Sequence, residues 1–160
     1  GLPDAAFDLA VAGQCWHWFD RPRAAVEVLR VLKPGGTLMI AHFDWLRLAG
    51  GVVAATEDLI LAHNPAWAGA GKSAPYPAWY LDLRDGGFRS IESFGFETDV
   101  AYTHEAWRGR IRASAGIAAS LPPEKVAAFD AAHAALLARA FPADPLAVPH
   151  RCWAVWGTKS

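Results

Sequence analysis

The feature that most constrains the fold is a strand, helix and strand pattern near the start of the chain. Phe7–Ala12 is a short, mostly apolar run closed by Gly13, which is typical of a strand buried on both faces. Asp20 can cap the helix that follows, and apolar residues recur at helical spacing until Lys33–Gly36 ends it. A second apolar run covers Thr37–Ala41. The order predicts a βαβ unit with a right-handed crossover.

The rest of the chain predicts further helices and two more strands. The hydrophobic periodicity favours helices over 52–62, 78–84, 104–119 and 123–140, and strands over about 91–102 and 150–156. We expect the last strand to be antiparallel. The predicted organisation is part of one domain over 1–160: a βαβ core (1–46), a loop and helix insertion (47–76), a helix and strand (77–103), a helical insertion (104–147) and a final strand (148–160).

Composition and charge exclude several classes of partner. The chain has 160 residues, 53% of them hydrophobic, which is enough for one packed core. A net charge of -1 with 19% charged residues is not the footprint of a nucleic-acid-binding protein. The apolar runs are far shorter than the roughly 18 residues that a membrane span needs, and no basic leader is present. We expect a cytoplasmic protein that binds neither nucleic acid nor membrane.

Metal, disulfide and nucleotide chemistry have little support. Cys15 and Cys152 are expected to be buried small hydrophobic residues, and the six His residues are scattered, so no metal is predicted. Gly69–Ser73 matches the tail of a phosphate-binding loop. Neither a strand before it nor a helix after it supports the match, and the first glycine of the pattern is replaced by Ala66. Nucleotide hydrolysis through Lys72 is therefore the least supported functional hypothesis.

Three segments of the first forty residues carry a family resemblance. They are Leu2–Leu9, Gln14–Asp20 and Glu27–Leu38, the last containing Arg-Val-Leu-Lys-Pro-Gly-Gly before a strand. In these segments the chain resembles the class I S-adenosylmethionine-dependent methyltransferases, in particular the methyltransferase type 11-like group that acts on small molecules. The resemblance implies an α/β, Rossmann-like sheet that is mixed because of a final antiparallel strand, carries helical insertions and lacks the family's N-terminal strands.

The resemblance also implies a cofactor and its site. S-adenosylmethionine is the expected cofactor, and the backbone and side chains of Ala12, Gly13 and Gln14 would face its methionine part. Leu2 would flank the adenine. The family's glycine-rich loop and acidic ribose contact are not found in this sequence. The alternative is that Gly13 only ends a strand and that Gln14 is solvated.

Aromatic residues beside this segment are candidates for the substrate side. Trp16 and Trp18 can hold a sulfonium or line the substrate site through their faces, although packing in the core is an equal alternative. His17 is the candidate catalytic base, since the pKa of an unperturbed imidazole suits proton transfer from a hydroxyl or carboxyl group. A role as pocket wall is the favoured alternative for His17.

A second set of substrate candidates lies in the helical insertion. Arg108 and Arg112 are one helical turn apart beside Trp107, and two guanidiniums can bind an anionic small-molecule substrate such as a carboxylate. The favoured alternative is a solvated basic face balanced by Glu105. The remaining aromatic candidates for the same cleft are Trp45, Trp67, Trp79 and Tyr102.

Two functional hypotheses remain open at this point. The first is methyl transfer from S-adenosylmethionine to a small molecule by in-line displacement in a closed pocket. The second is a non-catalytic remnant or interaction module that has lost cofactor binding. The strand over Phe7–Ala12 also predicts a flat apolar edge, through which the chain would aggregate or form a homo-oligomer.

Overall fold

The computed structural model describes residues 1–160 as two compact units. Unit 1 comprises Gly1–Asp44, Ser73–Glu97 and Arg151–Ser160, and unit 2 comprises Trp45–Lys72 and Thr98–His150. The strands are β1 (Phe7–Gly13), β2 (Leu32–Trp45), β3 (Arg89–Tyr102) and β4 (Leu146–Thr158). The helices are α1 (Arg21–Val31), α2 (Val52–His63), α3 (Pro77–Asp85), α4 (His104–Arg112), α5 (Pro123–Ala140) and the short 3-10 helix η1 (Trp16–Trp18).

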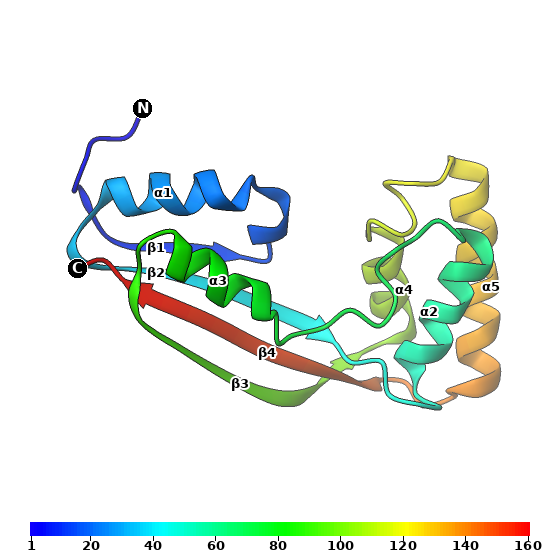
Figure 1. Ribbon diagram of the computed structural model, residues 1–160. Helices are drawn as coiled ribbons and strands as arrows, with labels where there is room; N and C mark the ends of the chain where they lie inside the picture. Colours follow the sequence, from blue (N-terminus) through cyan, green and yellow to red (C-terminus); the bar gives the residue numbers. More distant parts are fainter. The chain divides into compact units, whose positions relative to one another are not determined.

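A four-stranded sheet in the order β1-β2-β4-β3 organises the fold (Figure 1). β1 pairs with β2 in parallel, ending with Gly13 opposite Ala41. Within unit 1, β4 runs opposite to β2, and their pairing includes the backbone bonds between Lys159 and the Gly35–Gly36 pair. The predicted mixed α/β sheet with a parallel βαβ unit and an antiparallel last strand is therefore confirmed.

Helix α1 begins and ends where its sequence signals predict. The Asp20 carboxylate accepts a hydrogen bond from the Arg23 backbone N–H at 3.4 Å, and Pro22 occupies the first turn. The helix ends at Val31, because Leu32 already has extended backbone angles. Strand β2 is longer than the predicted 37–41 and begins at Leu32. Between the pairs Phe7–Leu32 and Leu9–Thr37 its register with β1 is irregular, so the expected turn is absorbed into the strand.

The core of unit 1 lies between the sheet and helices α1 and α3, which contact each other. Its largest members are Trp16, Leu32, Leu38, Ile40, Trp79, Leu83, Phe88 and Trp153. On the opposite face of the sheet, the large apolar side chains of the two edge strands β1 and β3 are exposed. Phe94 and Phe96 on β3 stack there with a centroid distance of 6.3 Å. Helices therefore cover one face of this sheet and leave the other open within unit 1.

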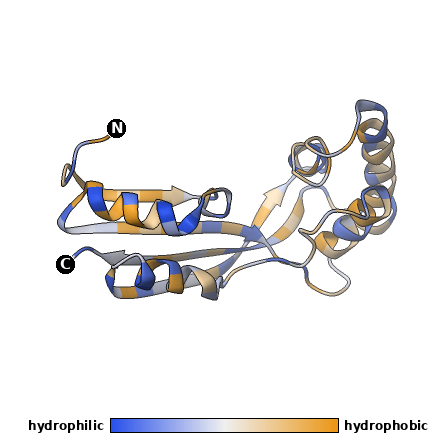
Figure 2. Cartoon of the chain, turned by 45° about the horizontal axis from the view of Figure 1, so that its top comes forward, coloured by the Kyte–Doolittle hydropathy of each residue, from blue (hydrophilic) through white to orange (hydrophobic).

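Strand β1 corrects one prediction and supports another. It was expected to be buried on both faces, but Phe7, Leu9 and Val11 are 39%, 55% and 59% exposed. The physical reason is that α1 and α3 cover only the face that holds Ala10 and Ala12. β1 also has a single strand neighbour, so the predicted apolar edge is present (Figure 2).

Unit 2 is built on the contacts of α5 with α2 and α4. Its buried core includes Ile60, Trp107, Ile111, Phe129, Leu137 and Val148. Helix α4 ends at Arg112, several residues before the predicted end at 119, and a run of turns follows it. No helix in the structure combines the length and the hydrophobicity that crossing a bilayer requires.

Candidate functional site

The turn that follows β1 places Gly13 and Gln14 at the carboxyl end of the parallel pair. Gln14 has a φ of 59°, and its backbone N–H donates to the Ala41 carbonyl at 2.9 Å. Its side-chain amide donates to the Phe43 carbonyl at 2.7 Å, which fixes this left-handed turn against β2. A side chain built at Gly13 would meet nothing within 4 Å, so the strand end is open. Ala12 is buried, so only its backbone can face a ligand.

Helix η1 gives its three aromatic residues different surroundings. Trp16 is 1% exposed and packs in the core of unit 1, where its indole N–H donates to Asp82 at 3.0 Å. Its predicted place in a substrate cleft is wrong, because its faces are covered by core residues. Trp18 is 71% exposed, and the ring of His17 lies between Trp18 at 4.6 Å and His42 at 5.3 Å.

His42 and Asp44, at the end of β2, form a polar cluster that sequence reasoning missed. The His42 Nδ1 atom lies 3.2 Å from one oxygen of Asp44. The other oxygen accepts from the Tyr76 hydroxyl at 2.8 Å and from the Ala74 backbone N–H at 3.0 Å. The His42 Nε2 atom is buried and has no hydrogen-bond partner. The signal that could have found this pair is two ionisable residues directly after a buried parallel strand.

The electrostatics of this cluster favour an ionised Asp44 and a neutral His17. Burial works against ionisation of Asp44, but the hydrogen bonds from His42, Tyr76 and Ala74 outweigh it and lower the pKa of the carboxyl group. Burial and the bonded Asp44 raise the pKa of Tyr76, so its hydroxyl stays protonated. Partial burial, followed by the nearby His42, lowers the pKa of His17. His17 is thus a neutral imidazole at pH 7, as a proton acceptor must be.

The predicted substrate residues of the helical insertion have structural partners within unit 2. Trp107 is fully buried and donates to the Thr56 hydroxyl at 3.2 Å. Arg108 donates to both oxygens of Asp130, and Arg112 donates to Asp130 and to Glu105 at 2.7 Å each. Both guanidiniums are thus already paired with carboxylates of this chain. The prediction that Arg108 and Arg112 bind an anionic substrate is therefore corrected, and the alternative of a charged face balanced by Glu105 is favoured.

The other sequence-predicted residues are also placed by the structure. The Leu2 carbonyl accepts from Arg30 in the last turn of α1, beside the start of β1. The structure therefore does not bring Leu2 together with Gly13, which ends the same strand. Trp79 lies in the core of unit 1. The remaining aromatic candidates pack against the core of unit 2; they are Trp45, Trp67 and Tyr102.

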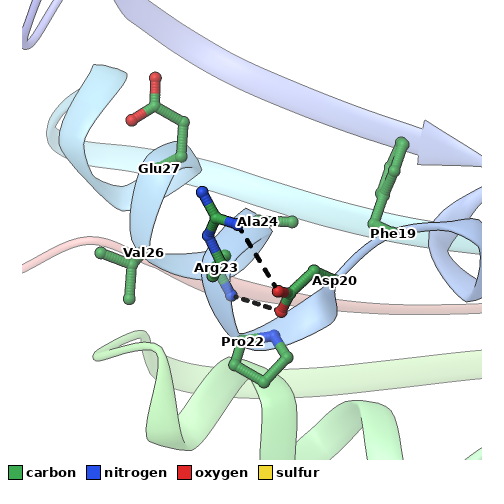
Figure 3. Close-up of a pocket in the computed structure, with 7 residues that line it drawn as sticks. All are labelled: Phe19, Asp20, Pro22, Arg23, Ala24, Val26 and Glu27. Atoms are coloured by element: carbon green, nitrogen blue, oxygen red, sulfur yellow. Dashed lines mark hydrogen bonds and ion pairs between the residues drawn. The ribbon is translucent and has the colours of Figure 1, made fainter.

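A shallow hollow of about 690 Å³ lies over the first turns of α1 (Figure 3). It is lined by Phe19, Asp20, Pro22, Arg23, Ala24, Val26 and Glu27. The Asp20 carboxylate facing it already caps the helix and contacts the Arg23 guanidinium. None of the predicted cofactor or catalytic residues lines this hollow, and the strand end with its histidine cluster is the better candidate site.

Comparisons with known proteins agree with the fold. Residues 1–40 match the family described as "Methyltransferase domain". An uncharacterized methyltransferase of Mycobacterium bovis is 36% identical over 63 residues, which are 36% of this chain and 26% of that protein. An uncharacterized methyltransferase of Schizosaccharomyces pombe is 49% identical over 39 residues, 24% of this chain and 16% of that protein.

Solved structures match almost the whole chain. A protein from Anabaena variabilis, named as a methyltransferase from an antibiotic biosynthesis pathway, has a TM-score of 0.59 at 19% identity and covers 99% of this chain and 69% of its own. A protein named as a type II methyltransferase from Anaeromyxobacter dehalogenans has a TM-score of 0.54 at 22% identity and covers 99% of this chain and 66% of its own.

Residues 1–40 are thus similar to a methyltransferase domain, and the chain as a whole has the fold of these solved methyltransferase structures. The resemblance expected from the three N-terminal segments is therefore confirmed, since all three segments lie within the matched residues 1–40. The chain spans only 26% of the length of the Mycobacterium relative that it matches.

Proposed function

We propose that this domain transfers a methyl group from S-adenosylmethionine to a small molecule. The observation that carries the proposal is the open turn at Gly13, which follows β1 inside the matched residues 1–40. In open α/β sheets, ligands bind at the carboxyl ends of parallel strands, and this turn is such an end. The similarity of residues 1–40 to a methyltransferase domain supports this reaction class.

The residues at this strand end fit the methionine part of the cofactor. A Cβ added at Gly13 would have no other atom within 4 Å, and glycine has no side chain of its own. A ligand can therefore approach the backbone closely at this position. The bonds of Gln14 to Ala41 and Phe43 hold the turn in one conformation before any ligand arrives. When bound, S-adenosylmethionine would supply an electrophilic methyl group on its sulfonium.

The residues of the chain would contribute position and proton transfer. The exposed His17 imidazole is neutral and lies next to the strand end, where it can accept a proton or form a wall of the site. Trp18 offers an exposed aromatic face that can attract a sulfonium through a cation–π contact, at about 0.5 to 2 kcal/mol. Alignment and exclusion of water would supply most of the remaining rate acceleration.

Calorimetric titration with S-adenosylhomocysteine tests the proposal. We expect the chain to bind this product with a micromolar dissociation constant. Gly13→Phe places a ring at the open end of β1, where a Cβ meets no atom within 4 Å, and should weaken binding by at least about tenfold. Ala140→Phe is the matched control, because it adds the same ring at an exposed position at the end of α5 in unit 2.

The titration also discriminates the second hypothesis. A chain that shows no heat of binding and no thermal stabilisation with S-adenosylhomocysteine would contradict the proposal. That result would favour a non-catalytic interaction module, which keeps the class I architecture without the cofactor. Equal weakening by Gly13→Phe and Ala140→Phe would place the cofactor away from β1.

A further inference from the structure

The His42 and Asp44 pair has a fixed direction of hydrogen bonding. One oxygen of Asp44 accepts from two donors, the Tyr76 hydroxyl and the Ala74 backbone N–H. Because an ionised carboxylate can only accept, the Nδ1 atom of His42, 3.2 Å away, must be the donor. With its hydrogen on Nδ1, the imidazole of His42 can offer a lone pair only at Nε2.

The Nε2 lone pair is the unusual feature of this cluster. His42 is 7% exposed, and its Nε2 atom is buried with no partner. Three rings surround the imidazole, with centroids at 4.7 Å for Trp79, 5.0 Å for Tyr76 and 5.3 Å for His17. Buried polar atoms in folded proteins nearly always have partners, so an orphaned acceptor points to a group that the site is built to receive.

The position of His42 in the sheet connects this acceptor to the candidate site. Ala41 is the last residue of β2 that pairs with β1, opposite Gly13, and His42 follows it directly. Of the rings around the imidazole, those of Trp79 and Tyr76 are not exposed, whereas His17 is exposed, so His17 is the neighbour that connects the cluster to the surface. All of these residues belong to unit 1.

We propose that His42, oriented by Asp44, is the proton acceptor for the methyl acceptor, and that this substrate is an uncharged molecule with an O–H or N–H group. The inference rests on the proposed methyl transfer. A lone pair on Nε2 attracts a donor and repels a carboxylate oxygen, and the ionised Asp44 behind it adds to that repulsion. This substrate class differs from the anionic one predicted from Arg108 and Arg112.

The proton and electron balance of the step is simple. The O–H or N–H bond of the substrate breaks, and its proton moves to Nε2 of His42. The electron pair stays on the oxygen or nitrogen, which forms the bond to the methyl carbon while the carbon–sulfur bond of S-adenosylmethionine breaks and leaves its pair on sulfur. The resulting imidazolium is stabilised by the carboxylate of Asp44 at Nδ1.

The first test is independent of methyl transfer and uses ¹⁵N NMR of the histidine side chains in the full chain. We expect neutral His42 in the Nδ1–H form, with an Nε2 resonance that shifts when phenol is added and does not shift with benzoate. Tyr76→Phe removes one donor to Asp44 and keeps the Nδ1–H form, whereas Asp44→Asn abolishes the preference. An Nε2–H form in the native chain, or no shift with phenol, would overturn the proposal.

Histidine variants decide which imidazole receives the donor. His17→Gln should keep the phenol-induced shift at His42, whereas loss of that shift would assign the role to His17 and overturn the proposal. His63→Gln in α2 is the control for the loss of a histidine elsewhere. These NMR results remain interpretable even if the chain methylates none of the molecules tested.

The second test measures methylation of phenol and of benzoate with S-adenosylmethionine by mass spectrometry. We expect methyl transfer to phenol, and His42→Gln should lower its rate about 100-fold, the usual contribution of a general base, while the dissociation constant of S-adenosylhomocysteine is unchanged. Methylation of benzoate alone, or an unchanged rate in His42→Gln, would contradict this inference. Absence of S-adenosylhomocysteine binding to the native chain would instead contradict the proposed function.

Discussion

At the residue scale, two tryptophans two positions apart have opposite roles. Trp16 anchors η1 to α3 through its bond to Asp82, which also pairs with Arg21 at 3.3 Å. Trp18 contacts His17 and is otherwise exposed. The apolar content of the segment predicts neither role, because both residues have the same chemistry and only the geometry of η1 turns one inward.

This difference gives a prediction for the two alanine variants. Trp16→Ala should lower the free energy of unfolding by about 3 to 5 kcal/mol, because it leaves a cavity in the core of unit 1 and removes a hydrogen bond. Trp18→Ala should change it by no more than about 0.5 kcal/mol. Urea denaturation measures both. A Trp16→Ala variant as stable as Trp18→Ala would contradict the packing described for η1.

The sequence predicted the ends of α1 and β1 well because their signals are local. Asp20 as cap and Gly13 as strand end act through the backbone of their own segments. The polar pair of His42 and Asp44 was not predicted, because the hydrogen-bond partners of Asp44 are distant in the sequence. Tyr76 is 32 residues from Asp44 and Ala74 is 30 residues from it. Arg108 and Arg112 were misassigned for the same reason, because Asp130 lies on α5.

At the element scale, β1 and α5 show how packing overrides composition. β1 has the apolar sequence of a buried strand but stands at a sheet edge with three large side chains exposed, Phe7, Leu9 and Val11. Its predicted association with a second copy stays a prediction. α5 contacts α2 and α4, and it buries His133 at 0% exposure, where the Nε2 atom lies 3.2 Å from the Thr56 hydroxyl.

Burial of His133 predicts that acid destabilises unit 2. Burial lowers the pKa of this imidazole from 6.5 to about 4, although Asp130 works in the opposite direction. The folded state therefore holds His133 neutral, and its full stability is present above the unfolded pKa of 6.5. As the pH falls from 6.5 to about 4 the unfolded state takes up a proton first, so up to about 3 kcal/mol is lost.

Urea denaturation between pH 7 and pH 4, followed by a probe in α5, measures this loss. His133→Gln should be less stable than the native chain at pH 7 and should show a shallower decrease on acidification. His63→Gln serves as the comparison, since His63 lies on α2 and packs edge-on against Phe129. An identical pH dependence in the His133→Gln variant would exclude His133 as the group responsible.

At the scale of the whole molecule, the two units divide the sequence-predicted site. Gly13, Gln14 and His17 belong to unit 1, as do the unpredicted His42 and Asp44. The other predicted substrate residues, Trp107, Arg108 and Arg112, belong to unit 2 and are engaged there. We therefore propose that the cofactor binds and the proton is transferred in unit 1, at the carboxyl ends of β1 and β2.

Backbone amide NMR during titration with S-adenosylhomocysteine tests this central claim most directly. We expect saturable shifts centred on Gly13, Gln14 and His17, extending to His42 at the end of β2, with much smaller shifts along α5. Shifts confined to unit 2, or none at concentrations well above micromolar, would contradict it.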